Sequence, residues 1–309
     1  MNETGIPAGG NAQFDARARR VKGCVSMPDF STITILGPGL LGGSLALAIQ
    51  ERMPGARLRL WARRDSAEAE IRARGIRAVF FTDATAACHG ADFIILATPV
   101  ETMRALAARI ALAELPAHAL VTDVGSVKGS VVGELAPILG GRFIGSHPMA
   151  GSEKTGIETA RADLFEGAAC LLTPLEGQDA APLRAFWQSL GCRVLAMTPE
   201  EHDLKVARIS HLPHWMAVVT TLAALRADPD AAACAAGGFR DTTRVAGGDP
   251  GLWTGISLAN REALLASLRD ASSTLTELVE ILSKPDEEAL RRLLAEANNL
   301  RALLPAARI

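Results

Sequence analysis

The segment GSHPMAGSEKTG, from Gly145 to Gly156, places one histidine and one glutamate among small residues. It offers almost no apolar surface for a core, although 49% of the chain is hydrophobic. Such a run is either an ordinary surface loop or a loop shaped around a small polar ligand. Histidine changes its charge near neutral pH and can take up a proton. His147 is either a satisfied histidine at a strand end or a functional group, with Glu153 as a second polar group in the same loop.

Polar residues without an obvious packing role also occur in the segments DVGSVKG, ISHLPH and GGFRDTTR. Each segment has an ordinary explanation when it is considered alone. A serine often caps the helix that follows it, two histidines three residues apart can share one helical face, and arginines are commonly solvated. Only the four segments together favour a functional site. The residues concerned are Ser126, His211, His214, Arg240 and Arg244.

The run GPGLLG, residues 37–42, fits the G-x-G-x-x-G pattern of loops that bind dinucleotides. It follows the β-rich run STITILG and opens the helical run LLGGSLALAIQER, which is the context that the pattern requires. The first glycine permits a tight turn, the second lets the backbone approach a pyrophosphate, and the third lets helix and strand pack closely. The free amides and the dipole of the helix start then hold the phosphates. The residues expected at the cofactor are Gly37, Gly39, Leu40, Leu41 and Gly42.

The end of the second predicted strand, in RLRLWARRDS, indicates which cofactor is bound. NAD-binding domains usually place an acidic residue there for the ribose 2′-hydroxyl. Arg63 stands at this position and Arg64 follows it, with Asp65 close by. A guanidinium binds a 2′-phosphate through charge-assisted hydrogen bonds. The sequence therefore favours NADP, with NAD possible if these arginines are only solvated.

The elements that would position these residues alternate between strand and helix from residue 31 onward. STITILG, RLRLWA, DFIILATPV and HALVTDVG are predicted strands, and helical runs separate them. This order implies βαβ units and a parallel sheet. RFIGSH is expected to be a further strand, and the loop containing Glu153 follows its carboxyl end, where such sheets bind ligands.

The chain changes character near residue 198. GAACLLTP and CRVLAMTP are expected to be strands on either side of a helix over residues 181–190, whereas only helical periodicity follows Pro199. The sequence predicts a flexible extension over 1–30, a Rossmann-type nucleotide-binding domain over 31–198 and an all-α domain over 199–309. The apolar positions of the last two predicted helices indicate burial against their own domain or a second subunit.

Composition excludes several functional classes. The net charge is −2 and Lys and Arg form no basic block, so nucleic acid is not an expected partner. Five dispersed cysteines without a CxxC pair argue against a zinc site or a disulfide framework and suit the cytoplasm. No apolar run is long enough for a membrane span. The absence of tyrosine excludes dehydrogenases that use a Tyr-x-x-x-Lys pair.

The motifs together resemble those of the prephenate and arogenate dehydrogenases of tyrosine biosynthesis. GPGLLGGSLALA, ATPV, DVGSVKG, HPMAGSEKTGIE, LFEGAACLLTP, SHLPH and GGFRDTTRVAGGDPGLW occur in that family's order and spacing. The resemblance covers nearly all of the chain from residue 31. It implies a Rossmann-type domain followed by an all-α dimerisation domain, a homodimer, and an active site between the two domains. It also implies oxidative decarboxylation of a small cyclohexadiene acid with hydride transfer to NAD(P), without a metal.

The resemblance also implies roles for individual residues. His147 matches the family's catalytic histidine, and Ser126 matches the serine that bridges this histidine, the substrate hydroxyl and the nicotinamide. Arg244 matches the arginine that binds a substrate carboxylate. His214 and Glu153 match polar residues around the substrate side chain.

Three further positions follow from the same motifs. His211 matches a position in the substrate site, and Thr98 and Pro99, in ATPV, match positions at the cofactor. Arg63 departs from the family's usual aspartate, which leaves the choice of coenzyme open.

Two other readings stay open at this stage. The β-hydroxyacid dehydrogenases share the two-domain plan, but their Lys-x-x-x-Asn pair is missing, because Ile209 stands four residues after Lys205. A cofactor-sensing binding protein would need the glycine-rich loop but not the combination of His147, Ser126 and Arg244. The choice between prephenate and arogenate also stays open, and the SHLPH and GSEKTG segments favour prephenate.

Overall fold

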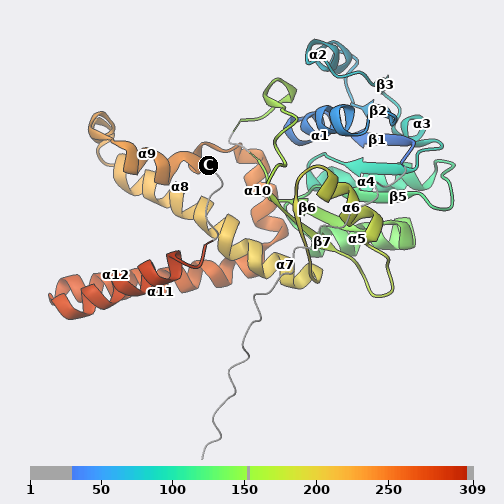
Figure 1. The fold of residues 1–309 in the computed structure, drawn as a ribbon. Coiled ribbons are helices and arrows are strands. Elements are labelled where there is room, and N and C mark those ends of the chain that lie inside the picture. The colour runs from blue at the N-terminus through green and yellow to red at the C-terminus, as the bar shows by residue number, and fades with distance from the viewer. Residues whose placement is uncertain (1–29, 152–153, 305–309) are drawn as a thin grey trace, which may run out of the picture.

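Five short strands form a parallel sheet in the order β3-β2-β1-β4-β5 in the computed structural model, which describes residues 30–151 and 154–304 (Figure 1). Glu153 and the predicted extension up to residue 29 lie outside the described residues. Every residue of β1, β4 and β5 is buried, as expected for strands covered on both faces. The strands are β1 (Thr32–Leu36), β2 (Arg57–Trp61), β3 (Val79–Phe81), β4 (Phe93–Leu96) and β5 (Leu120–Asp123).

Helices connect these strands and cover the sheet. The predicted alternation is confirmed, and the first helix begins directly after the glycine-rich loop. β3, α3 and α4 were not assigned individually from the sequence, because their apolar runs are short or broken by polar residues. The helices are α1 (Leu40–Arg52), α2 (Ala67–Ala73), α3 (Ala84–Cys88), α4 (Val100–Ala111) and α5 (Gly129–Leu139).

A second, three-stranded sheet has the order β6-β7-β8, with bounds Gly145–Pro148, Ala169–Thr173 and Arg193–Ala196. The three predicted strands are present, and this second sheet is mixed, because β6 runs antiparallel to β7 while β7 and β8 are parallel. A parallel pair needs a crossover, usually a helix. The described part of the β6–β7 connection contains only one short 3-10 turn, η2 (Ile157–Thr159).

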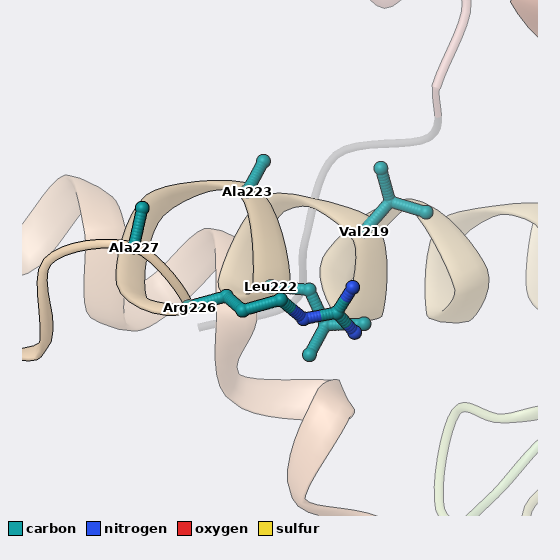
Figure 2. Close-up of a pocket in the computed structure, with 5 residues that line it drawn as sticks. All are labelled: Val219, Leu222, Ala223, Arg226 and Ala227. Carbon is teal, nitrogen blue, oxygen red and sulfur yellow. The ribbon is translucent and has the colours of Figure 1, made fainter.

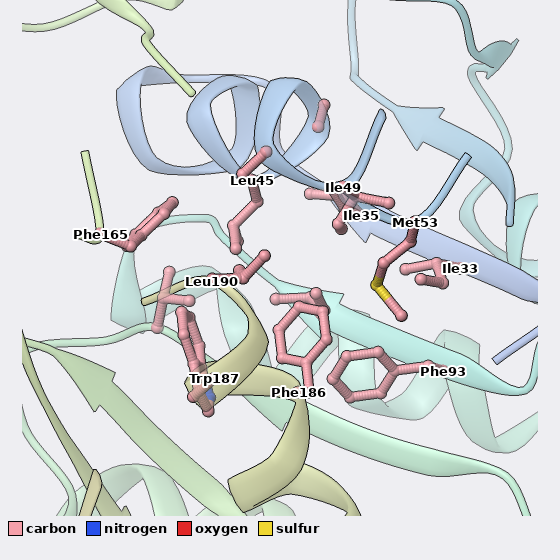
Figure 3. Packing of buried hydrophobic residues seen from close by; sticks show 14 of the residues in the cluster. Ile33, Ile35, Leu45, Ile49, Met53, Phe93, Phe165, Phe186, Trp187 and Leu190 are labelled. Atoms are coloured by element: carbon pink, nitrogen blue, oxygen red, sulfur yellow. The ribbon is translucent and has the colours of Figure 1, made fainter. Parts of the chain in front are cut away.

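The hydrophobic core joins the two sheets. Leu45 and Ile49 of α1 face Phe186 and Trp187 of α6 (Ala181–Ser189), as Figure 3 shows. The Phe186 ring contacts Phe93 of β4 edge to face, with centroids 4.8 Å apart. This packing fixes β6 beside β5, so the strand carrying His147 lies next to the carboxyl end of the parallel sheet.

The chain is helical after β8, and the change of architecture falls between Ala196 and Pro199. α7 packs against α5 and β7, and α10 packs against α4, while α8, α11 and α12 extend away from the sheets (Figure 1). No helix among the described residues is long and apolar enough to cross a membrane. The helices are α7 (Pro199–Val206), α8 (Leu212–Leu225), α9 (Gly237–Thr243), α10 (Pro250–Ala259), α11 (Arg261–Ser283) and α12 (Glu287–Arg301).

Candidate active site

The glycine-rich loop forms a cradle that only glycine can build at two positions. Gly37 has a φ of 105°, and a Cβ there would lie 2.7 Å from the carbonyl oxygen of Ala97. A Cβ at Gly42 would collide with the carbonyl oxygen of Gly37. Gly39 is open on its Cβ side, and no side chain caps the start of α1, where Leu40 and Leu41 form the first turn. These free helix-start amides fit a pyrophosphate.

Thr98 and Pro99 lie on the rim of this cradle. They follow β4, which pairs with β1, and a Cβ at Gly37 would also lie 2.7 Å from the methyl carbon of Thr98. Pro99 is the residue that precedes the first turn of α4. Both positions predicted from the ATPV segment are therefore beside the proposed cofactor.

Arg63 lies at the edge where the cradle meets β2. The amide of Gly37 donates to the carbonyl of Trp61 at 3.0 Å, which ties the loop to the end of that strand. Arg63 is exposed and makes no ion pair with any residue that the structure describes, whereas Arg64 pairs with Glu70 at 3.3 Å. Of the two arginines, Arg63 is the one left to bind an anion.

His147 is the centre of a buried histidine pair. Its side chain, on β6, places Nδ1 2.9 Å from Nε2 of His202 on α7. His202 is fully buried, and its Nδ1 lies 2.8 Å from the Asp203 carboxylate. Burial holds the pKa of His147 well below its ordinary value, and His202, Lys128 and His211 act in the same direction. His147 is therefore neutral near pH 7, as a general base must be.

A π-helical segment, η3 (Ala207–His211), separates α7 from α8. Nine residues of regular α-helix make about two and a half turns, so His202 and His211 would point to opposite sides. The wider π turn changes this register, and both histidines lie near His147. Pro213 has no amide hydrogen for the regular helical bond, which favours an irregular turn here. Sequence periodicity did not predict this feature.

His211 is a buried neutral group beside Ser126. Burial lowers its pKa to about 4, Asp203 opposes this shift, and the Ser126 backbone is in contact with the ring. Nδ2 of Asn260 lies 2.9 Å from the Asp203 carbonyl, to which it donates, and 3.3 Å from Nδ1 of His211. The structure thus brings the DVGSVKG and ISHLPH segments together.

Ser126 does not cap a helix, so that interpretation of the serine is wrong. α5 begins only at Gly129, and no side chain of its own N-terminal residue caps it. The Asp203 carboxylate instead accepts the amides of Lys128 and Gly129, each at 2.8 Å. Ser126 is half-buried in the loop between β5 and α5, which leaves its hydroxyl without that packing role.

His214 lies on α8 in a pocket made by an aromatic ring. It stacks on Trp253 of α10 with centroids 3.5 Å apart and planes inclined by 8°. Its Nδ1 is buried and has no hydrogen-bond partner among the described residues. Such an unsatisfied buried nitrogen is expected where a ligand binds.

Arg244 begins the 3-10 turn η5 (Arg244–Gly247), which packs on α8. Arg244 is exposed, and the backbone of the next residue, Val245, is hydrogen-bonded to His214. Arg240 is exposed one turn earlier on α9. The structure thus places Arg244 near His214, while Glu153 lies outside the residues it describes.

Four polar residues of this region were missed by sequence reasoning. His202 and Asp203 occur in EEHDLK, which is typical of a solvated helix start. Lys128 and Asp123 form an ion pair with both side chains fully buried. Asp123 also accepts the amides of Gly125 at 2.7 Å and Ser146 at 3.2 Å. The available signal was that DVGSVKG places two charges at the end of a strand that is buried throughout.

No cluster of three or more His, Cys, Asp or Glu side chains is arranged for a metal ion in residues 30–151 and 154–304. Two surface depressions lie away from the buried histidines. One is formed on α8 by Val219, Leu222, Ala223, Arg226 and Ala227 (Figure 2). The other lies beside α3 and the end of α4.

The Rossmann-type domain carries a phosphate cradle, and the helical domain beside it supplies buried histidines. This combination defines a two-domain dehydrogenase that uses a nicotinamide cofactor. The chain belongs to the prephenate dehydrogenase family. The family model for its nucleotide-binding domain matches residues 45–196, and the model for its dimerization domain matches residues 198–296.

Individual relatives agree with this assignment. The chain is 35% identical over 285 residues to a prephenate dehydrogenase of Bacillus subtilis, covering 89% of this chain and 76% of that protein. It is 32% identical to a cyclohexadienyl dehydrogenase of Zymomonas mobilis, covering 90% and 97%. The family decides against the β-hydroxyacid dehydrogenase and binding-protein readings.

Solved structures show the same architecture. Prephenate dehydrogenase of Aquifex aeolicus, in complex with hydroxyphenyl propionate and NAD+, matches with a TM-score of 0.80 at 32% identity, covering 88% of this chain and 97% of that one. Arogenate dehydrogenase of Synechocystis matches with a TM-score of 0.75 at 34% identity, covering 88% and 99%.

Proposed function

We propose that this protein oxidatively decarboxylates prephenate to 4-hydroxyphenylpyruvate in tyrosine biosynthesis. The observation that carries the proposal is the buried, neutral His147, positioned by His202 beside the end of the sheet that holds the cofactor cradle. The homology to prephenate dehydrogenases over most of the chain supports the same reaction.

His147 accepts the proton of the substrate's 4-hydroxyl group. Loss of this proton lets the C4–H electron pair leave as hydride. The ring carboxylate then departs as CO2, and the electrons of the broken C–C bond make the ring aromatic, while His147 returns its proton to the phenol oxygen. The bound nicotinamide supplies the hydride acceptor. A neutral imidazole suits the base, because its low pKa keeps it unprotonated while it waits for substrate.

Ser126, His211, His214 and Arg244 hold the substrate. Ser126 orients the 4-hydroxyl toward His147, and Arg244 binds a carboxylate. An arginine clamped on the ring carboxylate would stabilise the ground state and oppose decarboxylation. Arg244 therefore serves catalysis best on the side-chain carboxylate, close to His214.

Arg63 selects NADP over NAD in this proposal. It is the unpaired cation beside the cradle, and a 2′-phosphate would give it an anionic partner. The cradle itself serves either cofactor, since both carry the same pyrophosphate.

Arogenate is the second candidate substrate, because an arogenate dehydrogenase matches this chain at 34% identity. Prephenate carries a keto group where arogenate carries an ammonium. A side-chain donor such as His214 suits a keto oxygen, which favours prephenate. Glu153 would favour the ammonium, with Lys154 beside it to offset that charge.

The helical domain forms a homodimer in this proposal. Exposed apolar side chains follow one stripe of α11, where Leu275, Val279 and Leu282 are 53%, 54% and 58% exposed. The apolar depression on α8 is a further exposed apolar surface of this domain (Figure 2). A second copy would cover both surfaces, as the family's dimerization domain suggests.

The substrate test compares prephenate with arogenate by following the absorbance of the reduced nicotinamide. We expect the higher kcat/KM with prephenate, and His214→Ala should raise KM for prephenate more than for arogenate. If arogenate is the better substrate and His214→Ala affects both equally, His214 does not set specificity and the arogenate assignment replaces the first.

A further inference from the structure

The side chains of Asp203, His202 and His147 form a hydrogen-bonded chain. Asp203 Oδ1 lies 2.8 Å from Nδ1 of His202, and His202 Nε2 lies 2.9 Å from Nδ1 of His147. A carboxylate can only accept hydrogen bonds. His202 must then carry its proton on Nδ1, which leaves its Nε2 as an acceptor. His147 must therefore donate from Nδ1, and its Nε2 is left without a proton.

The charge states needed for this order are those the surroundings favour. Burial opposes ionisation of Asp203, but hydrogen bonds from His202, Lys128 and Gly129 outweigh it and lower the pKa of the carboxyl. Burial also lowers the pKa of His202, although Asp203 opposes this. Near pH 7 the hydrogen-bonded chain thus consists of one carboxylate and two neutral imidazoles. The reversed order would require a protonated Asp203.

Asp203, at the far end of the hydrogen-bonded chain from His147, is held in place. The backbone amides of Lys128 and Gly129 both donate to Asp203, and Asn260 donates to its carbonyl. His202 is fully buried, so bulk solvent does not compete for the hydrogen bonds of its ring. Neither residue belongs to the glycine-rich cradle or to the segments that hold the substrate.

We propose that His202 and Asp203 are positioning residues that fix His147 in the tautomer with an unprotonated Nε2 as the proton acceptor. The role of that acceptor rests on the proposed function, but the tautomer itself follows from geometry alone. Without His202, the imidazole could adopt either tautomer and rotate. In serine proteases, changing the orienting carboxylate to an amide lowers kcat by about 10⁴ through the wrong tautomer.

The direct test is ¹⁵N NMR of the full-length protein with ¹⁵N-labelled histidine. The protein has six histidines, so the spectrum contains few signals. Near pH 7, we expect the His147 signals to show a protonated Nδ1 and an unprotonated Nε2, assigned by their loss in His147→Asn. A protonated Nε2 in the unmutated protein would overturn the proposal, whatever the enzyme's activity. This readout needs no substrate and no folded variant of His202.

The kinetic test uses a matched pair at residue 202. A Gln side chain can accept from His147 and donate to Asp203, whereas Leu can do neither. We expect His202→Leu to lower kcat by about 10–100-fold, the usual effect of losing an outer partner, with KM for prephenate unchanged. His202→Gln should restore most of kcat. Equal kcat in the two variants would contradict the proposal.

The two proposals fail in different ways. If NMR shows the assigned tautomer but prephenate is not oxidised, the proposed function is wrong and the tautomer assignment stands. Asp203→Ala adds an independent arm, because it removes the oxygen that accepts from Nδ1 of His202. His202 can then carry its proton on either nitrogen, so the His147 signals should show a mixture of both tautomers. An unchanged His147 spectrum in Asp203→Ala would overturn the role of Asp203.

Discussion

The chemistry at the scale of single residues depends on keeping one imidazole neutral in a buried place. Burial does most of this for His147, and the neighbouring histidines and Lys128 add to it. The same burial demands hydrogen-bond partners, because an unsatisfied buried polar group is costly. His202 supplies that partner, so the pKa and the orientation of the base have one structural origin.

Replacing the base tests its assignment. His147→Asn keeps a polar side chain but cannot take up a proton, so we expect kcat to fall by about 10²–10⁴-fold with KM for prephenate little changed. Stopped-flow or steady-state absorbance of the reduced nicotinamide gives both constants. An unchanged kcat would remove His147 from the mechanism.

The pH dependence of the rate follows from the lowered pKa. His147 works only unprotonated, so activity is present above its pKa and is lost as pH falls through it. Because that pKa lies well below 6.5, kcat/KM should be equal at pH 6.5 and at about pH 7 and should fall only in more acidic buffer. Loss of half the activity at or above pH 6.5 would show that His147 is not so perturbed.

Arg63 offers a test of cofactor choice with its neighbour as control. Arg63→Asp replaces attraction by repulsion at a 2′-phosphate, so kcat/KM should shift from NADP toward NAD. Arg64→Asp should shift it less, because Arg64 is already paired with Glu70. If the unmutated enzyme already prefers NAD, Arg63 does not select the cofactor.

At the scale of elements, the sequence predicted what depends on local pattern and missed what depends on pairing. β1, β4 and β5 could be predicted because strands buried on both faces are continuous apolar runs. The antiparallel β6–β7 pair could not, since strand direction depends on a connection whose residues carry no periodic signal. The π turn at η3 was missed because neighbouring helices hide it in the periodicity.

The candidate site divides in the same way. The family motifs pointed to His147, Ser126 and His211, and these three residues lie close together in the structure. His202 and Asp203 were not found, because a charged segment at a helix start is normally solvated. Their burial is created by α7 packing against α5 and β6, which is a tertiary effect.

The loop that joins β5 to α5 contains the buried Lys128–Asp123 ion pair. Removing one partner leaves an uncompensated buried charge, so Lys128→Met should lower the free energy of unfolding by about 3–5 kcal/mol. Arg72→Met, in the exposed Arg72–Glu68 pair, is the control and should change stability little. Urea denaturation measures both, and a similar small effect for the two variants would mean that the buried pair does not hold the loop.

At the scale of the whole molecule, the two parts divide the work. The sheets carry the cofactor cradle and the base, and the helical part brings His202, His211, His214 and Arg244 to them. α7 packs against α5 and β7, and α10 packs against α4 (Figure 1). α8, α11 and α12 extend away and leave apolar side chains exposed. We propose that the helical domain therefore both binds the substrate and provides the surface for a second subunit.

The assembly can be tested by light scattering at micromolar concentration. We expect a dimer for the unmutated protein and a monomer for Val279→Arg, because the change places a charge in the apolar stripe of α11. Leu112→Arg, at an exposed leucine at the end of α4, should stay dimeric. A monomeric unmutated protein would refute the proposed interface.

The central claim is that this protein couples oxidation of prephenate to its decarboxylation. The most direct measurement incubates the protein with prephenate and NADP and quantifies reduced nicotinamide, CO2 and 4-hydroxyphenylpyruvate in the same sample, with His147→Asn as the matched control. The account predicts equal amounts of all three from the unmutated protein and far slower formation of all three from the variant. Reduced nicotinamide without CO2, or no turnover with either NADP or NAD, would contradict it.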